Sequence, residues 1–95
     1  MKLISIKPST NPEKKYTAKF KMDNDREKTV HFGQKGARDF IKTKDENLKK
    51  AYIARHRVNE DFNDPTTAGA LSRWILWNKP TLRASIADFK SKFNL

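Results

Sequence analysis

Hydrophobic and polar residues alternate along the first third of the chain. In the segment YTAKFKM every second residue is hydrophobic: Tyr16, Ala18, Phe20 and Met22. The segment KTVHFG continues the alternation after the polar stretch DNDRE. A period of two is typical of a half-buried β-strand, and DNDRE has the composition of a turn. The pattern therefore predicts an antiparallel hairpin, and LISI near the N-terminus predicts a third strand.

The register of this hairpin depends on the length of its loop. Pairing Phe20 with Val30 keeps Lys28 off the hydrophobic face of the sheet. The same register places Ala18 opposite Phe32. The alternative, which has a shorter loop, pairs Phe20 with Lys28. We expect the longer loop, because a sheet that is covered on one side buries its hydrophobic face, and the longer loop keeps Lys28 away from that face.

The hydrophobic period becomes helical after Gly36. ARDFIK predicts a short helix, and DENLKKAYIARHRV predicts a longer one with acids at its start and arginines near its end. TTAGALSRWILWN predicts a third helix, which Thr66 or Thr67 caps and Lys79-Pro80 ends. PTLRASIADFKSKF predicts a fourth, with its proline in the first turn and a hydrophobic stripe. That stripe consists of Leu82, Ile86, Phe89 and Phe93.

Strands followed by helices indicate an α+β fold. We expect an N-terminal antiparallel sheet of about three strands, with three or four helices packed on one face. A length of 95 residues corresponds to a single domain with a modest core. Within it, residues 1–33 form the β part and residues 37–95 the helical part.

The two tryptophans lie three residues apart in the third predicted helix. An α-helical stripe places Trp74 beside Leu71 and Ile75, which predicts a core position. The same geometry places Trp77 at the border of the stripe. Trp77 then either covers the edge of the sheet or forms a partly exposed docking residue for a partner.

The charge of the chain is strongly unbalanced. It contains 21 Lys and Arg against 11 Asp and Glu, a formal net charge of +10. This excess favours a polyanionic partner, either nucleic acid or an anionic membrane surface, over a merely solvated lysine coat. Cysteine is absent, which excludes disulfides and thiolate chemistry. No apolar segment has the length of a transmembrane helix or signal peptide, so we expect an intracellular protein that is not secreted.

The sequence contains few groups suited to catalysis. His31 falls on the polar face of a strand, and His56 lies four residues before Glu60. Two such ligands do not make a zinc site. The chain also lacks the usual serine-nucleophile, nucleotide-loop and paired-carboxylate motifs. We therefore expect neither an enzyme nor a bound metal or cofactor.

Basic residues gather at two predicted positions along the chain. Lys15, Lys19 and Lys21 share the outer face of one strand, where they either contact phosphates or protect a sheet edge from aggregation. Arg55 and Arg57 lie near the end of a helix, where they either bind phosphates or complement the helix dipole.

The segment HFGQKGARDF forms a third basic feature, between a strand and a helix. Gly33 and Gly36 allow the backbone to turn with its N–H groups exposed, and the start of the next helix adds partial positive charge. Lys35 and Arg38 add full charges. The segment is therefore either a phosphate-binding corner or a tight turn that needs glycine for geometry alone.

Three stretches of the chain resemble a known set of proteins: YTAKFK, KTVHFGQKGARDF and YIARHRVNEDFNDPTTAGALSRWILWNKPTLRASIADFKSKF. They are similar to an uncharacterised family of small basic proteins encoded by nucleocytoplasmic large DNA viruses, the giant viruses of algae and protists. The resemblance covers the chain from Tyr16 onward. It implies a viral protein in the host cytoplasm, at the viral factory, or in the virion, and it assigns no residue roles.

Charge and resemblance together predict sequence-nonspecific nucleic-acid binding in genome packaging or organisation. We expect contacts with the phosphates of double-stranded DNA. The expected contact residues are Lys15, Lys19, Lys21, Lys35, Arg38, Arg55 and Arg57. The alternative is a minor capsid or other virion structural protein that docks an acidic protein or an inner-membrane partner through Trp77. Steep weakening by salt distinguishes phosphate binding from such docking.

Overall fold

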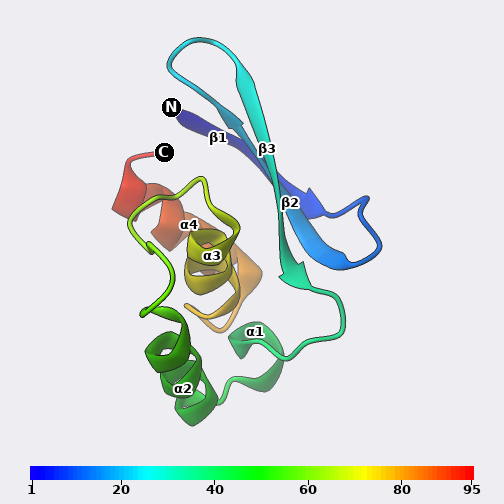
Figure 1. Ribbon diagram of the computed structural model, residues 1–95, viewed down its shortest axis with the longest axis vertical. Coiled ribbons are helices and arrows are strands. Elements are labelled where there is room, and N and C mark those ends of the chain that lie inside the picture. The colour runs from blue at the N-terminus through cyan, green and yellow to red at the C-terminus, as the bar shows by residue number, and fades with distance from the viewer.

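A three-stranded antiparallel sheet is covered on one of its faces by the C-terminal helical segments (Figure 1). The structure is a computed structural model that describes residues 1–95. Strands β1 (Lys2–Pro8), β2 (Lys14–Lys21) and β3 (Glu27–Gln34) are arranged in the order β1-β2-β3. The predicted α+β fold and its third strand are therefore confirmed.

The register of the β2–β3 hairpin differs from the expected one. Phe20 pairs with Lys28, and Ala18 pairs with Val30. Lys28 is accommodated opposite Phe20 because its ammonium group reaches beyond the sheet and donates a hydrogen bond to Thr66 Oγ1 at 3.3 Å. The expected register was wrong because it treated Lys28 as a residue without a polar partner on that face.

The helical part begins beyond the end of β3 and returns along the sheet. Its elements are α1 (Phe40–Thr43), α2 (Glu46–His56), α3 (Ala68–Leu71), the π-helix η1 (Ser72–Leu76) and α4 (Leu82–Phe93). Side-chain oxygens cap each α-helix at its N-terminus by accepting hydrogen bonds from backbone N–H groups. The capping residues are Asp39, Asp45, Thr67 and Thr81. Thr67, rather than Thr66, caps the third predicted helix.

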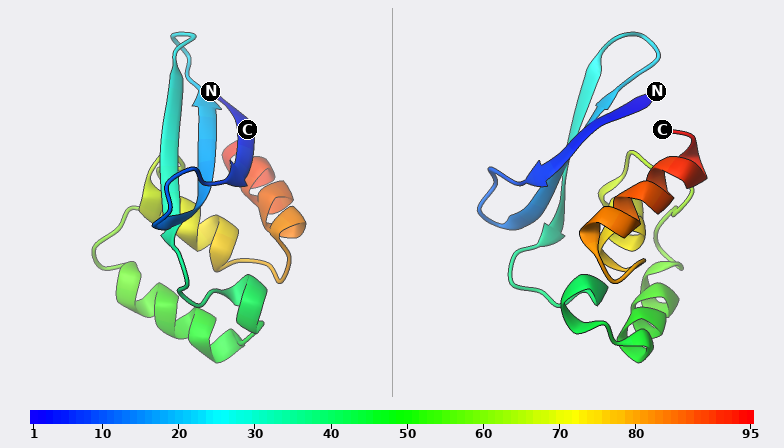
Figure 2. Two further views of the ribbon diagram at one scale, coloured as in Figure 1. Left: turned by 90° about the vertical axis from the view of Figure 1, so that its right-hand side faces the viewer. Right: turned by 180° about the vertical axis from the view of Figure 1, so that it is seen from behind.

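The hydrophobic core lies between the sheet and the α3–η1–α4 segment. Figure 2 shows α3 and α4 beside the sheet, whereas α1 and α2 lie beyond one end of its strands. Phe20 of β2 meets Phe89 of α4 edge-on, with 6.5 Å between ring centroids. The core cluster comprises Ala18, Phe20, Phe32, Phe40, Leu71, Ile75, Leu76, Trp77 and Phe89.

The third predicted helix changes its hydrogen-bond pattern after Leu71. Trp77 N donates to Ser72 O at 3.1 Å, which is the five-residue spacing of a π-helix. The wider turn shifts the buried stripe away from its α-helical positions. As a result, the four consecutive residues from Ile75 to Asn78 are all buried.

This shift exchanges the expected positions of the two tryptophans. Trp77 is only 8% exposed and belongs to the core, so its expected place at the border was wrong. Trp74 is partly buried, and its Nε1 donates to the Phe62 carbonyl at 2.8 Å. The cationic groups of Arg73 and Lys92 lie 4.1 and 4.3 Å from the centroid of the Trp74 ring.

Candidate functional site

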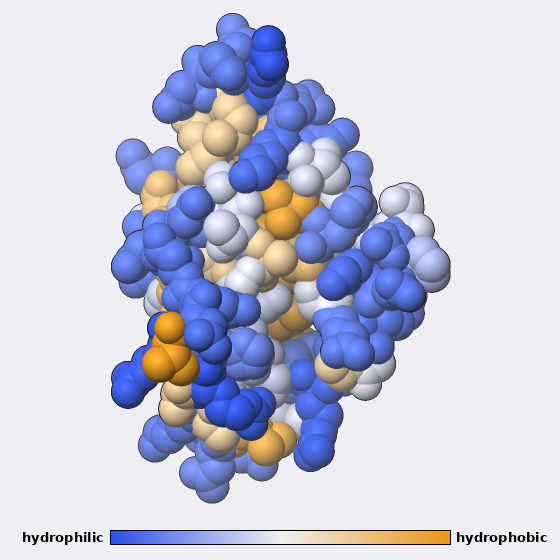
Figure 3. Space-filling view, viewed as in Figure 1, coloured by the Kyte–Doolittle hydropathy of each residue, from blue (hydrophilic) through white to orange (hydrophobic).

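A groove of about 520 Å³ separates the end of β3 and the following loop from α2 and α3. We call it the corner groove. In Figure 3 a strip of apolar and pale surface runs down the middle of the molecule, between hydrophilic surfaces on either side. Residues that line the corner groove on the sheet side include Lys14, Phe32, Gly33 and Arg38, and those on the helical side include Leu48, Tyr52, Arg55, His56, Glu60 and Trp77.

Three cations line the corner groove without an acidic partner. Arg38 and Arg55 are exposed, and Lys14 is partly buried. Their side chains make no ion pair and no hydrogen bond within the chain. The acid that lines the groove, Glu60, lies 3.6 Å from His56 through its Oε1. The groove therefore has an excess of positive charge that can attract an anion.

Three aromatic rings form a column along the helical side of the corner groove. Tyr52 stacks on Trp77, with 4.5 Å between centroids and 9° between ring planes. His56 stacks on the same tyrosine at 4.1 Å and 23°. Burial, and secondarily the negative charge of Glu60, raise the pKa of Tyr52 to about 12. Its phenol is therefore neutral at physiological pH and adds no negative charge to the groove.

Glu60 packs closely against the first turn of α3. Its Oε2 is buried and has no hydrogen-bond partner. A Cβ at Gly69 would lie 2.7 Å from that oxygen, so a larger residue there would displace the Glu60 carboxylate. The carboxylate therefore closes one side of the corner groove instead of projecting into solvent.

Lys15 does not lie on an open outer face, contrary to the sequence prediction. Its Nζ is 2.6 Å from Asp39 Oδ2 and 2.5 Å from Ala37 O. The side chains of Lys15 and Asp39 are 10% and 6% exposed. Lys15 therefore fastens the loop after β3 to β2, and it is unsuited to contact an external phosphate.

The loop between β3 and α1 has the geometry of a turn. Gly33 and Gly36 have φ of 77° and 84°, in the left-handed region that favours glycine. The N–H groups of Lys35 and Ala37 donate to Glu13 O and Gln34 O. The carboxylate of Asp39 occupies the start of α1. These contacts support the alternative that the glycines shape a turn, because little of this backbone is available to a phosphate.

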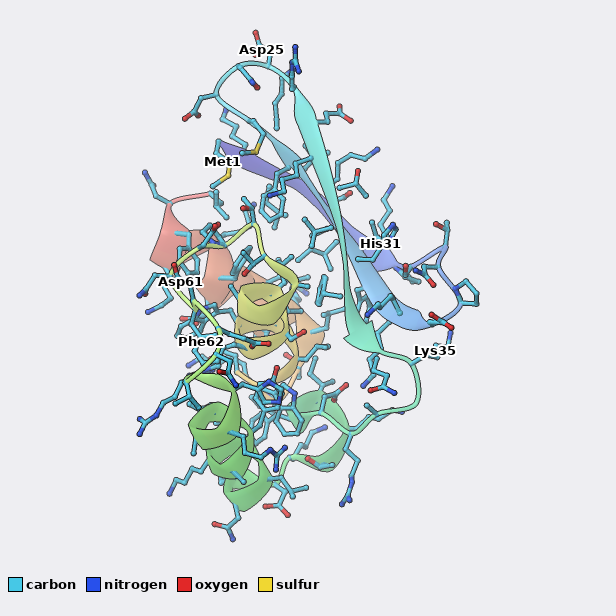
Figure 4. The ribbon with its side chains drawn as sticks, in the orientation of Figure 1. Met1, Asp25, His31, Lys35, Asp61 and Phe62 are labelled. Carbon is cyan, nitrogen blue, oxygen red and sulfur yellow. The ribbon has the colours of Figure 1, made fainter.

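The remaining expected contact residues lie apart from one another in the structure. Lys35 lines a separate hollow of about 270 Å³, and Figure 4 shows it away from α2 and α3. Lys19 lies 3.7 Å from Glu27, and Lys21 is exposed near the hairpin loop. Arg57 is exposed at the end of α2. Of the seven expected residues, Arg38 and Arg55 are thus the exposed cations that line the corner groove.

The outer face of the sheet instead carries a small polar cluster. His31 lies on the side away from the helices (Figure 4). Its Nδ1 is 2.7 Å from Thr17 Oγ1 and 3.1 Å from Ser9 Oγ. These mutual hydrogen bonds give His31 a structural role on this face, outside the corner groove.

Sequence reasoning did not select four residues of the corner groove: Lys14, Tyr52, His56 and Glu60. Two signals were present in the sequence. Strand alternation places Lys14 and Lys15 on opposite faces of the sheet, and Lys14 falls on the face that the helices cover. Tyr52, His56 and Glu60 recur every four residues, a spacing that favours one side of a helix and its continuation. No comparable signal linked them to the loop after β3.

The structure contains no group of three or more His, Cys, Asp or Glu residues placed to hold a metal ion. None of its helices combines the length and apolar character needed to cross a membrane.

The fold and the corner groove define a small basic α+β protein with a cation-lined, partly aromatic groove. The chain belongs to a family of unknown function, DUF5754, whose model matches residues 4–56 and thus more than half of the sequence. The matched stretch contains nearly all of the sheet, the loop after β3 and helix α2. Neither a curated protein nor a solved structure matches the chain significantly.

Proposed function

We propose that this protein is a small basic viral protein that binds nucleic acid without sequence specificity through the corner groove. The observation that carries the proposal is the set of three lining cations, Lys14, Arg38 and Arg55, that have no acidic partner. Cations without internal partners can neutralise phosphates and release their counterions, which supplies most nonspecific affinity. Contacts of this kind position a nucleic acid without reading its bases.

The biological setting of the proposal comes from the resemblance to giant-virus proteins. A basic protein in the viral factory or virion would serve genome packaging or organisation, and double-stranded DNA is the nucleic acid that this setting favours. The capsid-docking alternative assigned Trp77 to its docking surface. Burial of that ring argues against this residue as a contact, because a docking residue must be reachable by the partner.

Matched charge reversals test the proposal. Arg38→Glu with Arg55→Glu alters the corner groove, whereas Lys19→Glu with Lys21→Glu changes the net charge equally on β2. We expect the groove variant to bind a mixed-sequence DNA at least about thirtyfold more weakly at low salt, and the strand variant to lose no more than about threefold. Fluorescence anisotropy at about 50 and 200 mM salt measures both effects. The wild-type protein should weaken steeply with salt, and the groove variant should have a smaller slope.

Three results would contradict the proposal. One is an absence of DNA and RNA binding by the wild-type protein at low salt. Another is an equal loss of affinity in the two double variants, which would indicate a diffuse charge effect. The third is a salt-insensitive complex with an acidic protein, which would support the docking alternative. Circular dichroism of each variant shows whether the fold is retained.

A further inference from the structure

We infer that the corner groove accepts single-stranded nucleic acid, with a base inside the groove and the backbone across its mouth. This inference rests on the proposed function, but it replaces double-stranded DNA by the single strand as the form that the groove prefers. A duplex presents phosphates outward and keeps its base faces stacked inside the helix. The apolar and aromatic side chains of the groove would therefore have nothing to contact in a duplex.

The positions of the cations support a strand that crosses the groove. Arg38 belongs to the sheet side and Arg55 to the helical side, so positive charge is available on both sides of the hollow. Successive phosphates flank each base of a single strand. A base that enters between the two arginines would leave its neighbouring phosphates near their guanidinium groups, which form strong hydrogen bonds with phosphate oxygens.

The lining between these cations has the chemistry of a base-binding surface. Tyr52 and Leu48 are partly buried, and the Tyr52 ring lies between Trp77 and His56, which cover its two faces. His56 ends this column, and its side chain is 39% exposed, so its outer face is the ring surface on which a base can stack. Aromatic and apolar side chains that are fixed in this way can pack against any base, which gives affinity without sequence preference. The neutral Tyr52 phenol also avoids repulsion of the nearby phosphates.

The volume of the groove limits what can enter. A hollow of about 520 Å³ falls within the range of pockets that hold a single small ligand. It is suited to one inserted nucleotide and is too small for a helix of paired strands. The inferred contact is therefore local: one base is inserted, and the rest of the strand is held by its phosphates.

Three labelled ligands of equal length test the inference with the unaltered protein. They are a mixed-sequence single strand of about 12 nucleotides, the duplex of the same sequence, and an abasic strand that keeps the sugars and phosphates. We expect the single strand to bind at least about tenfold more tightly than either of the others at the same salt concentration. Equal affinity for all three would overturn the inference while leaving salt-dependent phosphate binding, and hence the proposed function, intact.

A tyrosine substitution locates the effect. Tyr52→Leu removes the ring that supports His56, so it should reduce the affinity for the single strand about tenfold, to the level of the abasic strand, and should leave duplex binding nearly unchanged. Tyr16→Leu is the matched control, because Tyr16 is another partly buried tyrosine beside the core and does not line the corner groove. It should keep the single-strand preference.

The two proposals fail in different ways. If none of the three ligands binds, the proposed function is wrong and the inference falls with it. If the single strand is preferred but Tyr52→Leu keeps that preference, the base enters elsewhere and the assignment to this groove is wrong. If Tyr52→Leu loses its fold by circular dichroism, the comparison of intact and abasic strands with wild-type protein decides the inference.

Discussion

The two ends of the sheet carry similar amounts of basic charge in different settings. The loop of the β2–β3 hairpin projects beyond the helices at one end, with Asp25 at its tip (Figures 1 and 4). Two lysines of this hairpin have partners, since Lys19 lies near Glu27 and Lys28 donates to Thr66, whereas Lys21 is exposed and lines neither the corner groove nor the hollow beside Lys35. At the other end, Lys14, Arg38 and Arg55 line the corner groove without such partners. A count of lysines therefore does not locate a binding surface, whereas unpaired charge beside a shaped hollow does.

The two ends also differ in their relation to the core. The hairpin loop and the first residues of β3 are exposed throughout residues 23–29. The corner groove is lined by Phe32, Leu76 and Trp77, which are buried members of the core cluster. Substitutions in the groove wall should therefore reduce the free energy of unfolding, whereas substitutions on the hairpin should leave it nearly unchanged.

The largest effect is expected at the floor of the corner groove. Trp77→Ala should reduce the free energy of unfolding by about 3–5 kcal/mol, because it leaves a large cavity beside Tyr52 and the core. A loss of this size can unfold a small domain. Trp74→Ala should cost roughly 1–2 kcal/mol, since that ring is only partly buried. Chemical denaturation measures both values.

Acrylamide quenching provides an independent check in proteins that retain one tryptophan, with the other replaced by Phe. Trp77 should be protected, and Trp74 should be quenched more strongly. The opposite order would contradict the π-helical shift of this segment and restore the α-helical assignment.

The tryptophans show where sequence reasoning reaches its limit. Alternation and helical periodicity predicted the strands and the helices, because each element buries one face and the pattern records which face it is. A π-turn leaves no periodic signal of its own, and backbone hydrogen bonding across five residues instead of four moved Trp77 into the core. The hairpin register failed for a similar reason: Thr66, which satisfies Lys28, lies far away in the sequence.

The next effect contrasts two lysines of β2. Lys15→Met should cost about 3 kcal/mol of unfolding free energy, because it leaves the buried carboxylate of Asp39 without its ion-pair partner. The same substitution at Lys19 should cost less than about 0.5 kcal/mol, since the Lys19 and Glu27 side chains are 45% and 54% exposed. Thermal and urea denaturation of the two variants give the comparison directly.

A second substitution tests whether the ion pair is responsible. Asp39→Asn keeps a capping oxygen for α1 but removes the charge. Added to Lys15→Met, it should recover part of the lost stability, because no unpaired charge then remains buried. Equal costs for Lys15→Met and Lys19→Met would show that the Lys15 side chain is as solvated as that of Lys19.

Lys14 and Lys15 explain why the candidate site was only partly predictable. Alternation places them on opposite faces of β2, yet both line the corner groove, and the pattern could not show that the loop after β3 folds back over Lys15. Composition identified Arg38 and Arg55 as members of a basic set. Their common position in one groove depends on the packing of α2 beyond the end of the sheet, and no local pattern encodes that packing.

A smaller contrast is expected between the two glycines of the turn. Both have positive φ, so Gly36→Ala should cost about 1 kcal/mol from backbone strain alone. Gly33→Ala should cost roughly 2–3 kcal/mol, because its Cβ would also lie 2.7 Å from Leu76 Cδ1 and 3.2 Å from Lys15 Cβ. Urea denaturation compares them. Equal costs would mean that the groove wall can move away from Gly33 freely.

The smallest effect is confined to alkaline solution and concerns Tyr52. Its pKa in the folded protein is raised from 10.0 to about 12, chiefly by burial and then by the charge of Glu60. The phenol is therefore harder to ionise in the folded state than in the unfolded state, and its stabilising contribution is fully present below pH 10. That contribution should be lost as the pH rises through about 12. Urea denaturation at a series of pH values, from neutral upward, should show the decline. Tyr52→Phe has no proton to lose at this position, so its stability should decline less over the same range. If the two proteins respond identically to alkali, Tyr52 is solvated to the same degree in the folded and unfolded states, and the packed ring column of the groove wall is not maintained in solution.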